Sequence, residues 1–486
     1  MHQTLQKVET ETKKRVLFSS IFDLTKVFYE VSCGLIEAGI DVYWITTDDY
    51  WTNWLLAKGV KREDILQLIY DKSNFLDETE KESLASEIVR SEEIANLTIN
   101  QAIMMDSFLR YKNKPDVHEY AYLYYREIKN FFRDKQITHF FAEPTNSNEI
   151  ISYILCQELE IKFMVPRLTR YPENRLFFID SYHDYRFYPR PAKTSTMVSG
   201  NEIIKRFEQT LPTPGYSAKL SKRKIIDYRT IAKSIKNRLT HKKVFNQKNL
   251  THHDITGRIK LQLNGVVNSF CMKYLPNYEK LDDMKGRLAY FPMHVQPESS
   301  IDVMGSYFSD QLKLIKDIRR ALPVDTTLII KEHPNFLDMN NYSFFHKVKR
   351  IPGVKLVKYD VSTFDVLRRS DIVFTVSGTT AYQAGLLGIP AITFCPMFFE
   401  GLSSVHSCTN ILALRPLVYE LLTSFKRDYK ADCKFIEKLL CNSYDALWDN
   451  PKRSPHVLEQ ENMRKLHKAF ISVINVEQEA LAPVAC

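Results

Sequence analysis

Three short polar segments hold the residue types that bind anionic ligands. They read Pro-Met-His-Val-Gln-Pro-Glu-Ser-Ser over 292–300, Lys-Glu-His-Pro over 331–334 and Val-Ser-Gly-Thr-Thr over 376–380. Ammonium and imidazole groups, hydroxyls and the first amides of a helix can bind phosphate or carboxylate without a metal ion. The three segments therefore predict one phosphate-binding face, provided that the fold brings them together.

Each segment directly follows an apolar run that is typical of a buried strand, over 288–291, 326–331 and 372–376. Parallel strands present their carboxyl ends at one edge of an open α/β sheet, which is where ligands bind. We therefore assign donor or nucleotide contacts to eight residues of these segments: His294, Gln296, Lys331, His333, Ser377, Gly378, Thr379 and Thr380.

A simpler interpretation is open for each segment. The polar side chains can hydrogen-bond their own turns, a His-Pro pair is common in turns, and Ser or Thr often caps a helix. The sequence contains neither a G-x-x-x-x-G-K-[ST] phosphate loop nor a G-x-G-x-x-G motif, which disfavours an ATPase, a kinase or an ordinary dehydrogenase.

Alternating strand and helix patterns occur twice along the 486 residues, once from residue 15 and again from residue 287. This repetition predicts an α/β protein with two doubly wound, Rossmann-like domains that face each other across a cleft. Pro-rich and then basic helical sequence separates the two series. The expected divisions are an N-terminal domain over 1–190, a basic helical linker over 191–285, a C-terminal domain over 286–431 and C-terminal helices over 432–486.

Composition narrows the class of protein. A hydrophobic content of 44% is enough to build real cores, and no run approaches the roughly 18 apolar residues that a membrane span needs. The first residues are polar and charged rather than a signal peptide, so we expect a cytoplasmic protein. The eight cysteines are scattered, without zinc-ligand spacing, and no metal site is expected.

The net charge of +9 is concentrated between residues 219 and 243, where ten Lys or Arg stand against the single acid Asp227. An apolar stripe in the same stretch would let it lie on an anionic membrane surface, or equally pack against the enzyme. Tyr228 is its one aromatic residue and no nucleic-acid motif is present, so a nucleic-acid partner is not expected.

The order and spacing of these motifs over 288–394, with Gly-Ile-Pro-Ala at 388–391, resembles the capsule polysaccharide biosynthesis family, which includes the capsular Kdo transferases. The resemblance implies a two-domain glycosyltransferase of the B fold whose C-terminal domain binds the donor nucleotide. It implies that His333 and Pro334 contact the nucleotide and that 377–379 contacts phosphate. Gln383 stands where the family commonly has Glu, which affects donor identity or affinity.

The implied reaction is transfer of a sugar, such as Kdo from CMP-Kdo, to a cell-surface polysaccharide or a lipid-linked glycan. Such a reaction needs a base, for which Glu143 is the preferred candidate and Glu298 and Asp23 are the next candidates. No cofactor is expected. Two alternatives remain: a sugar-nucleotide epimerase or hydrolase of the same fold, and a non-enzymatic protein that binds a membrane surface.

Overall fold

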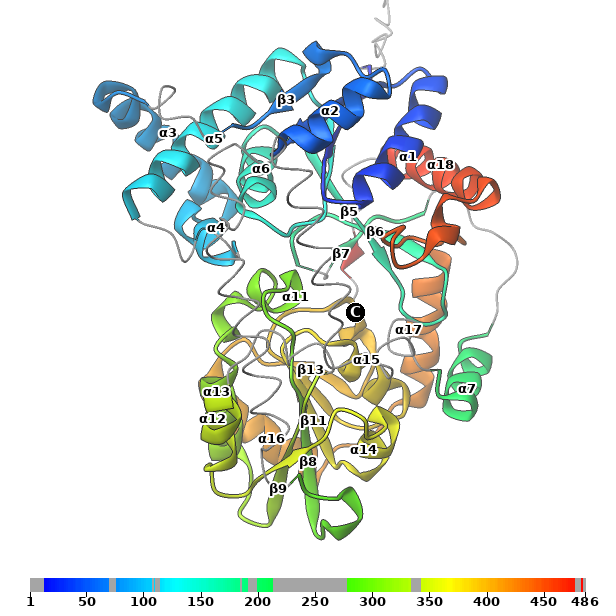
Figure 1. Cartoon of the computed structure of the whole chain (residues 1–486). Helices are drawn as coiled ribbons and strands as arrows, with labels where there is room; N and C mark the ends of the chain where they lie inside the picture. Colours follow the sequence, from blue (N-terminus) through cyan, green and yellow to red (C-terminus); the bar gives the residue numbers. More distant parts are fainter. Residues whose placement is uncertain are drawn as a thin grey trace, which may run out of the picture.

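The computed structural model describes residues 13–69, 76–106, 109, 114–183, 186–190, 199–212, 278–333, 342–476 and 482–483. They form two α/β domains, one above the other in Figure 1. The basic stretch 219–243 and Pro334 lie outside the described residues. No helix in the described ranges combines the length and apolar character needed to cross a membrane.

The N-terminal sheet has eight strands in the order β14-β7-β6-β5-β4-β1-β2-β3. Five are parallel: β1 (Arg15–Ser19), β2 (Asp41–Thr46), β3 (Ile65–Gln67), β4 (His139–Phe141) and β5 (Lys162–Leu168). Three antiparallel strands extend the sheet beyond β5: β6 (Leu176–Ile179), β7 (Arg186–Phe187) and β14 (Ala482–Pro483). The apolar run that begins at residue 15 thus lies in the middle of the sheet, next to β4.

Side chains of β1 alternate between two cores because successive residues of a strand point to opposite faces. Leu17 packs in the core on the side of α5 (Lys114–Asp134) and α6 (Ser147–Glu158). Val16 and Phe18 pack on the other side, against α1 (Leu24–Glu37) and α18 (Gln460–Ile474). The remaining N-terminal helices are α2 (Asp49–Ala57), α3 (Glu78–Ala95) and α4 (Ile99–Met105), whereas α7 (Gly200–Thr210) lies beside α17 (Tyr429–Cys441) (Figure 1).

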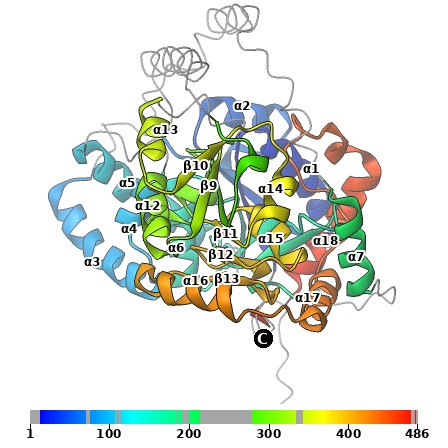
Figure 2. The same ribbon diagram turned by 90° about the horizontal axis from the view of Figure 1, so that it is seen from below.

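The C-terminal sheet is wholly parallel, in the order β10-β9-β8-β11-β12-β13. Its strands are β8 (Arg287–Pro292), β9 (Thr326–Lys331), β10 (Val354–Val357), β11 (Ile372–Thr375), β12 (Ala391–Thr393) and β13 (Val405–Ser407). Buried parallel strands need helices on both faces. In Figure 2, α12 (Gln311–Ala321) and α13 (Tyr342–Lys349) lie on one side, and α14 (Thr363–Arg369) and α15 (Thr379–Leu386) on the other.

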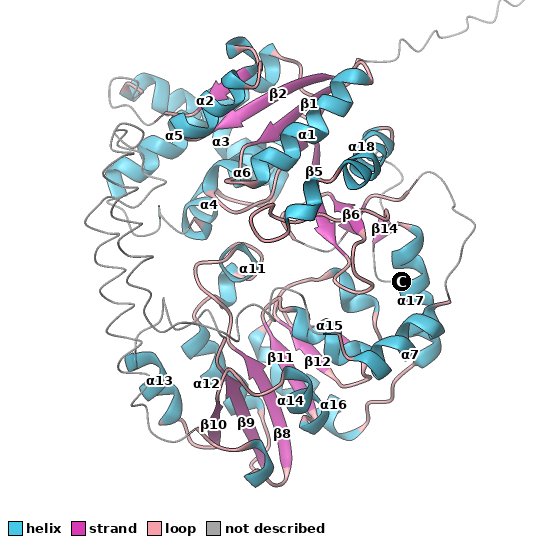
Figure 3. Cartoon of the chain, turned by 45° about the vertical axis from the view of Figure 1, so that its right-hand side comes forward, coloured by secondary structure: helices cyan, strands magenta, loops and turns pink. Residues whose placement is uncertain are grey.

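The two sheets are separate, and Figure 3 shows α11 (Ser299–Asp302) and α15 on the side of the second sheet that faces the first. Two parallel-strand α/β domains are what the sequence predicts, so the expected fold class is confirmed. Strands β3, β6, β7, β13 and β14 were not predicted. The sequence also assigns 167–175 to a loop, whereas β5 continues to Leu168 before the chain turns.

The end of the chain returns to the first domain. After α16 (Leu414–Thr423) and α17 (Tyr429–Cys441), the chain pairs Tyr444 with Leu176 of β6 and then forms α18, beside α1 (Figure 1). Trp448 and Phe470 pack against Phe28 with ring centroids 5.1 and 6.5 Å away. Helix α18 and the segment before it therefore complete the N-terminal core.

Candidate active site

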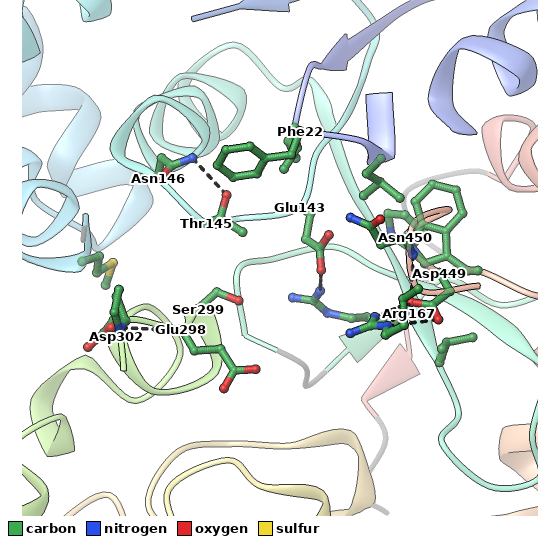
Figure 4. A pocket seen from close by; sticks show the side chains of 18 of the residues that line it. Phe22, Glu143, Thr145, Asn146, Arg167, Glu298, Ser299, Asp302, Asp449 and Asn450 are labelled. Carbon is green, nitrogen blue, oxygen red and sulfur yellow. Dashed lines mark hydrogen bonds and ion pairs between the residues drawn. The ribbon is translucent and has the colours of Figure 1, made fainter. Parts of the chain in front are cut away.

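Two adjoining cavities lie between the domains. One, of about 480 Å³, is lined by Glu143, Asn146 and Arg167 from the first domain and by Glu298 from the second, and we call it the Glu143 cavity (Figure 4). The other, of about 370 Å³, includes Thr379 and Gln383 of α15 in its wall, and we call it the Gln383 cavity. They share four lining residues: Leu168, Arg170, Asp449 and Arg453. A ligand that fills both would span the junction of the domains.

Glu143 projects into the first cavity from the carboxyl end of β4. Its carboxylate oxygen lies 3.4 Å from Nη1 of Arg167, on the neighbouring strand β5 (Figure 4). About a third of the Glu143 side chain remains open to solvent. Glu143 is thus an oriented and accessible carboxylate.

Glu298 lies on the opposite wall, at the start of α11. Its backbone N–H donates to Oδ2 of Asp302 at 3.0 Å, which fixes the turn. The side chain is exposed to the cavity, and the surrounding protein raises its pKa by desolvation, opposed by a hydrogen bond from Ser300 and the charges of Arg170 and Arg453. A carboxyl group with a raised pKa is a stronger base than an ordinary one.

Asp23 does not line either cavity. Its carboxylate is paired with Lys452 at 2.5 Å and with Lys26 at 3.1 Å. Burial opposes the ionisation of Asp23, but the hydrogen bonds from these two lysines outweigh it and lower its pKa. Asp23 fastens the C-terminal segment to the turn after β1, and our proposal does not use it as the base.

His294 is buried beneath the loop that precedes α15. Its Nε2 accepts a hydrogen bond from Val376 N–H at 3.1 Å and lies 2.8 Å from the Thr375 hydroxyl. Burial, with a smaller effect from His333, lowers the pKa of His294 to about 4, so the ring is neutral at pH 7. His294 supports the loop from below.

Gln296 and Ser377 are also committed to protein contacts. Both ends of the Gln296 amide are used: Nε2 donates to Asp302 and Ser309, and Oε1 accepts from Gln311. The Ser377 hydroxyl donates to the backbone carbonyl of Ser300. Gln296 thus stabilises the segment after β8 internally, and Ser377 joins this segment to the loop after β11, as two adjacent strand ends permit.

The start of α15 lies in the wall of the Gln383 cavity. Gly378 is its N-cap and supplies no side-chain cap, while Thr379 and Thr380 form the first helical positions. Such a helix start offers free amides and a favourable dipole to a phosphate. Thr379 and Gln383, four residues apart and on one face of the helix, both line the cavity.

Lys331 is the last residue of β9 and His333 follows it, at the edge of the sheet where the other two polar segments begin. Lys331 is buried and donates to the Thr363 hydroxyl at 2.9 Å. Burial lowers the pKa of Lys331 to about 8, partly offset by Asp360, which leaves the ammonium mostly charged at pH 7. His333 is half-buried and close enough to influence His294. Neither residue lines the two cavities, and Pro334 is outside the described residues.

The sequence prediction did not include several residues of the cavity walls. Arg167, Arg170 and Phe22 come from turns and strand ends of the first domain, and Asp449 and Arg453 come from the C-terminal segment. The only available signal was the density of arginines over 167–175. Across the described parts of the chain, no group of three His, Cys, Asp or Glu side chains is placed to hold a metal ion.

Comparison with known families identifies a similarity over the middle of the chain. Residues 208–408 match the model described as capsule polysaccharide biosynthesis protein. This match covers less than half of the chain. The match contains β8 to β13 and all three polar segments, so the family resemblance predicted from the motifs is confirmed. No curated protein matches the sequence.

Solved structures give weaker similarities to the chain. The UDP-GlcNAc 2-epimerase of Methanocaldococcus jannaschii is 12% identical over 87% of this chain and 95% of its own, with a TM-score of 0.26. The KpsC beta Kdo 2,7 transferase of Thermosulfurimonas dismutans is 12% identical over 65% of this chain and 80% of its own, with a TM-score of 0.31. At these scores we draw no argument from either structure.

Proposed function

We propose that this protein is a glycosyltransferase of capsule or related surface-polysaccharide synthesis, transferring a sugar from a nucleotide donor to a glycan or lipid-linked glycan. The observation that carries the proposal is the pair of adjoining cavities. One contains two carboxylates able to act as a base, and the other contains an uncapped helix start inside the family region. In this proposal the Gln383 cavity binds the donor and the Glu143 cavity binds the acceptor.

The donor would bind in the Gln383 cavity. The first amides of α15 and the hydroxyls of Thr379 and Thr380 would hold its phosphate, and Gln383 would accept a hydrogen bond from a ribose hydroxyl. Lys331 and His333, behind these loops, would add positive potential. We propose a CMP-activated acidic sugar such as CMP-Kdo, on the strength of the family resemblance, with a UDP-sugar as the alternative for the test.

In the proposed reaction Glu143 takes the proton of the acceptor hydroxyl. The oxygen then forms a bond to the anomeric carbon of the donor sugar, and the bond from that carbon to the phosphate oxygen breaks. The electron pair stays on the departing phosphate, whose charge the start of α15 stabilises. Glu298 is the second candidate for the base. We expect no metal ion or cofactor to be needed.

A thermal-shift panel of CMP, CDP, UMP, UDP and GDP tests the donor site, because a ligand that binds only the folded state stabilises it. We expect one nucleotide family to raise the melting temperature of the wild type and of Gln460→Ala, an exposed glutamine of α18. The shift should disappear in Gln383→Ala and Thr379→Val. If every nucleotide leaves all four proteins unchanged, the donor site is refuted.

Turnover separates a transferase from the epimerase or hydrolase alternative. Consumption of the donor sugar should depend on added capsule-type acceptor, whereas an epimerase or a hydrolase would act without it. Glu143→Gln should lower turnover by about 10²- to 10⁴-fold if Glu143 is the base. If Glu298 is the base instead, Glu298→Gln shows that loss, and the raised pKa of Glu298 moves the acidic limb of the pH profile upward.

A further inference from the structure

Backbone conformation singles out three residues of the cleft. Seven non-glycine residues in the described ranges have a left-handed φ, and four of them simply end helices: Asn96, Gln136, Glu160 and Leu211. The other three, Phe22, Arg170 and Asn174, all line the two cavities. Such conformations cost about 1 kcal/mol or more and persist where the surroundings enforce them, often at functional sites.

Phe22 presents an apolar ring to the Glu143 cavity. It lies in the turn between β1 and α1, has a φ of 42° and is 55% exposed. Figure 4 shows the ring beside Thr145 and Asn146, on the same side of the cavity as Glu143. A large aromatic side chain held open to water in a cavity is suited to cover the apolar face of a ligand ring.

Arg170 is the uncommitted cation of the cleft. Arg167 pairs with Glu143 at 3.4 Å, and Nε of Arg453 lies 2.8 Å from Asp449. By contrast, Arg170 is exposed, has a φ of 65°, and forms no hydrogen bond or ion pair with any residue that the structure describes, although its charge acts on Glu298 across the cavity. It lines both cavities, so its guanidinium is presented at their junction. An Arg fork without a protein partner fits a carboxylate or a phosphate.

We propose that Phe22 and Arg170 form the acceptor subsite of the enzyme, and that it binds a glycan unit bearing an anionic group. The ring of the sugar lies against Phe22, its carboxylate or phosphate pairs with Arg170, and its hydroxyl faces Glu143. This inference rests on the proposed function, because it takes the Glu143 cavity as the acceptor side. Beyond the proposed function, this inference states that the acceptor is anionic and names the two residues that select it.

Matched sugars test the subsite directly. The probes are methyl β-glucuronide and methyl β-glucoside, which share a ring and differ in the carboxylate, together with glucose 6-phosphate as the phosphate arm. Binding is measured by saturation-transfer NMR on the whole chain. The variants are Arg170→Gln and Phe22→Ala, with Arg90→Gln and Tyr419→Ala as controls, since Arg90 is exposed on α3 and Tyr419 is 66% exposed on α16.

We expect at least one anionic probe to bind the wild type and both controls about tenfold more tightly than the glucoside. Arg170→Gln should remove that preference, and Phe22→Ala should weaken all sugars that bind. Binding by glucuronide alone assigns a carboxylate, and binding by glucose 6-phosphate alone assigns a phosphate.

Equal binding of the charged and neutral sugars, no binding by any of the three, or a preference that survives Arg170→Gln would overturn the subsite. The nucleotide shift is a separate readout. If the wild type shows the nucleotide shift but binds none of the three sugars, the subsite is refuted and the donor site stands. If the wild type shows neither a nucleotide shift nor sugar binding, the proposed function itself is refuted.

Discussion

Replacing Gly378 with alanine would put a methyl group where the loop before α15 has no room. The added Cβ would lie 2.5 Å from the Thr375 hydroxyl oxygen and 3.2 Å from Cε1 of His294. The backbone φ of Gly378 is −73°, which alanine also adopts, so the effect comes from the contact and not from the backbone. Thr375 is fully buried and cannot turn its hydroxyl into solvent.

The size of the effect follows from what holds that hydroxyl. It accepts from Gly378 N–H at 3.0 Å and contacts Nε2 of His294 at 2.8 Å, so moving it aside loses two hydrogen bonds of about 1 kcal/mol each. Overpacking of a buried site costs about 1–3 kcal/mol. We therefore expect Gly378→Ala to lower the free energy of unfolding by about 2–3 kcal/mol. Displacement of the helix start should weaken nucleotide binding about tenfold, equivalent to 1.4 kcal/mol.

Urea unfolding and nucleotide titration of a double-mutant cycle check this reasoning. Thr375→Ala removes the clashing oxygen, so the double variant should be more stable than the sum of the two single costs predicts, by about 1 kcal/mol or more. If the two costs simply add, or if Gly378→Ala binds nucleotide like the wild type, the contact with Thr375 does not set the loop and the argument is refuted.

Four further predictions concern other parts of the chain. The pKa of His294 is about 4 in the folded state against about 6.5 in the unfolded state, so the stability that His294 provides is present above pH 6.5 and is lost toward pH 4. The difference in the free energy of unfolding between the wild type and His294→Gln should therefore shrink by about 1.4 kcal/mol per pH unit below 6.5. A difference that stays constant with pH contradicts this. Asp23→Asn should cost about 1–2 kcal/mol in urea unfolding through its contacts with Lys452 and Lys26, with no cost if those pairs are unimportant. Turnover should survive EDTA, and its loss would indicate a metal ion. Because of the charge over 219–243, the chain should co-sediment with anionic liposomes in a salt-sensitive way, and sedimentation that ignores salt and lipid charge would argue against this.

Much of the fold follows from apolar runs of the sequence. Residues 372–376 and 288–291 are continuous apolar stretches, as buried parallel strands require, and they form the neighbouring strands β11 and β8. The antiparallel strands β6 and β7 were harder to predict. Their partners are set by long-range pairing, and β7 has only two residues, Arg186–Phe187, which is too short for a periodic pattern.

The candidate site was predictable only in outline. The motifs placed Thr379 and Gln383 at a strand end, and both line a cavity, whereas a sequence cannot show that His294 faces the underside of a loop or that Asp23 is already paired with Lys452. Each of these outcomes depends on a residue far away in the chain. Arg453 and Asp449 reach the cleft by a return of the chain that leaves no periodic signal.

The return of the chain also sets an order for synthesis on the ribosome. Phe18 and Phe28 are among the first residues of the N-terminal domain, yet their partners Trp448 and Phe470 are made only after the whole second domain. This aromatic surface of the N-terminal domain therefore stays exposed until α18 leaves the exit tunnel. Both cavities gain Asp449 and Arg453 during the same late interval. A nascent chain halted after α17 would therefore hold the family region with an unfinished cleft, so the active enzyme and the finished fold appear together.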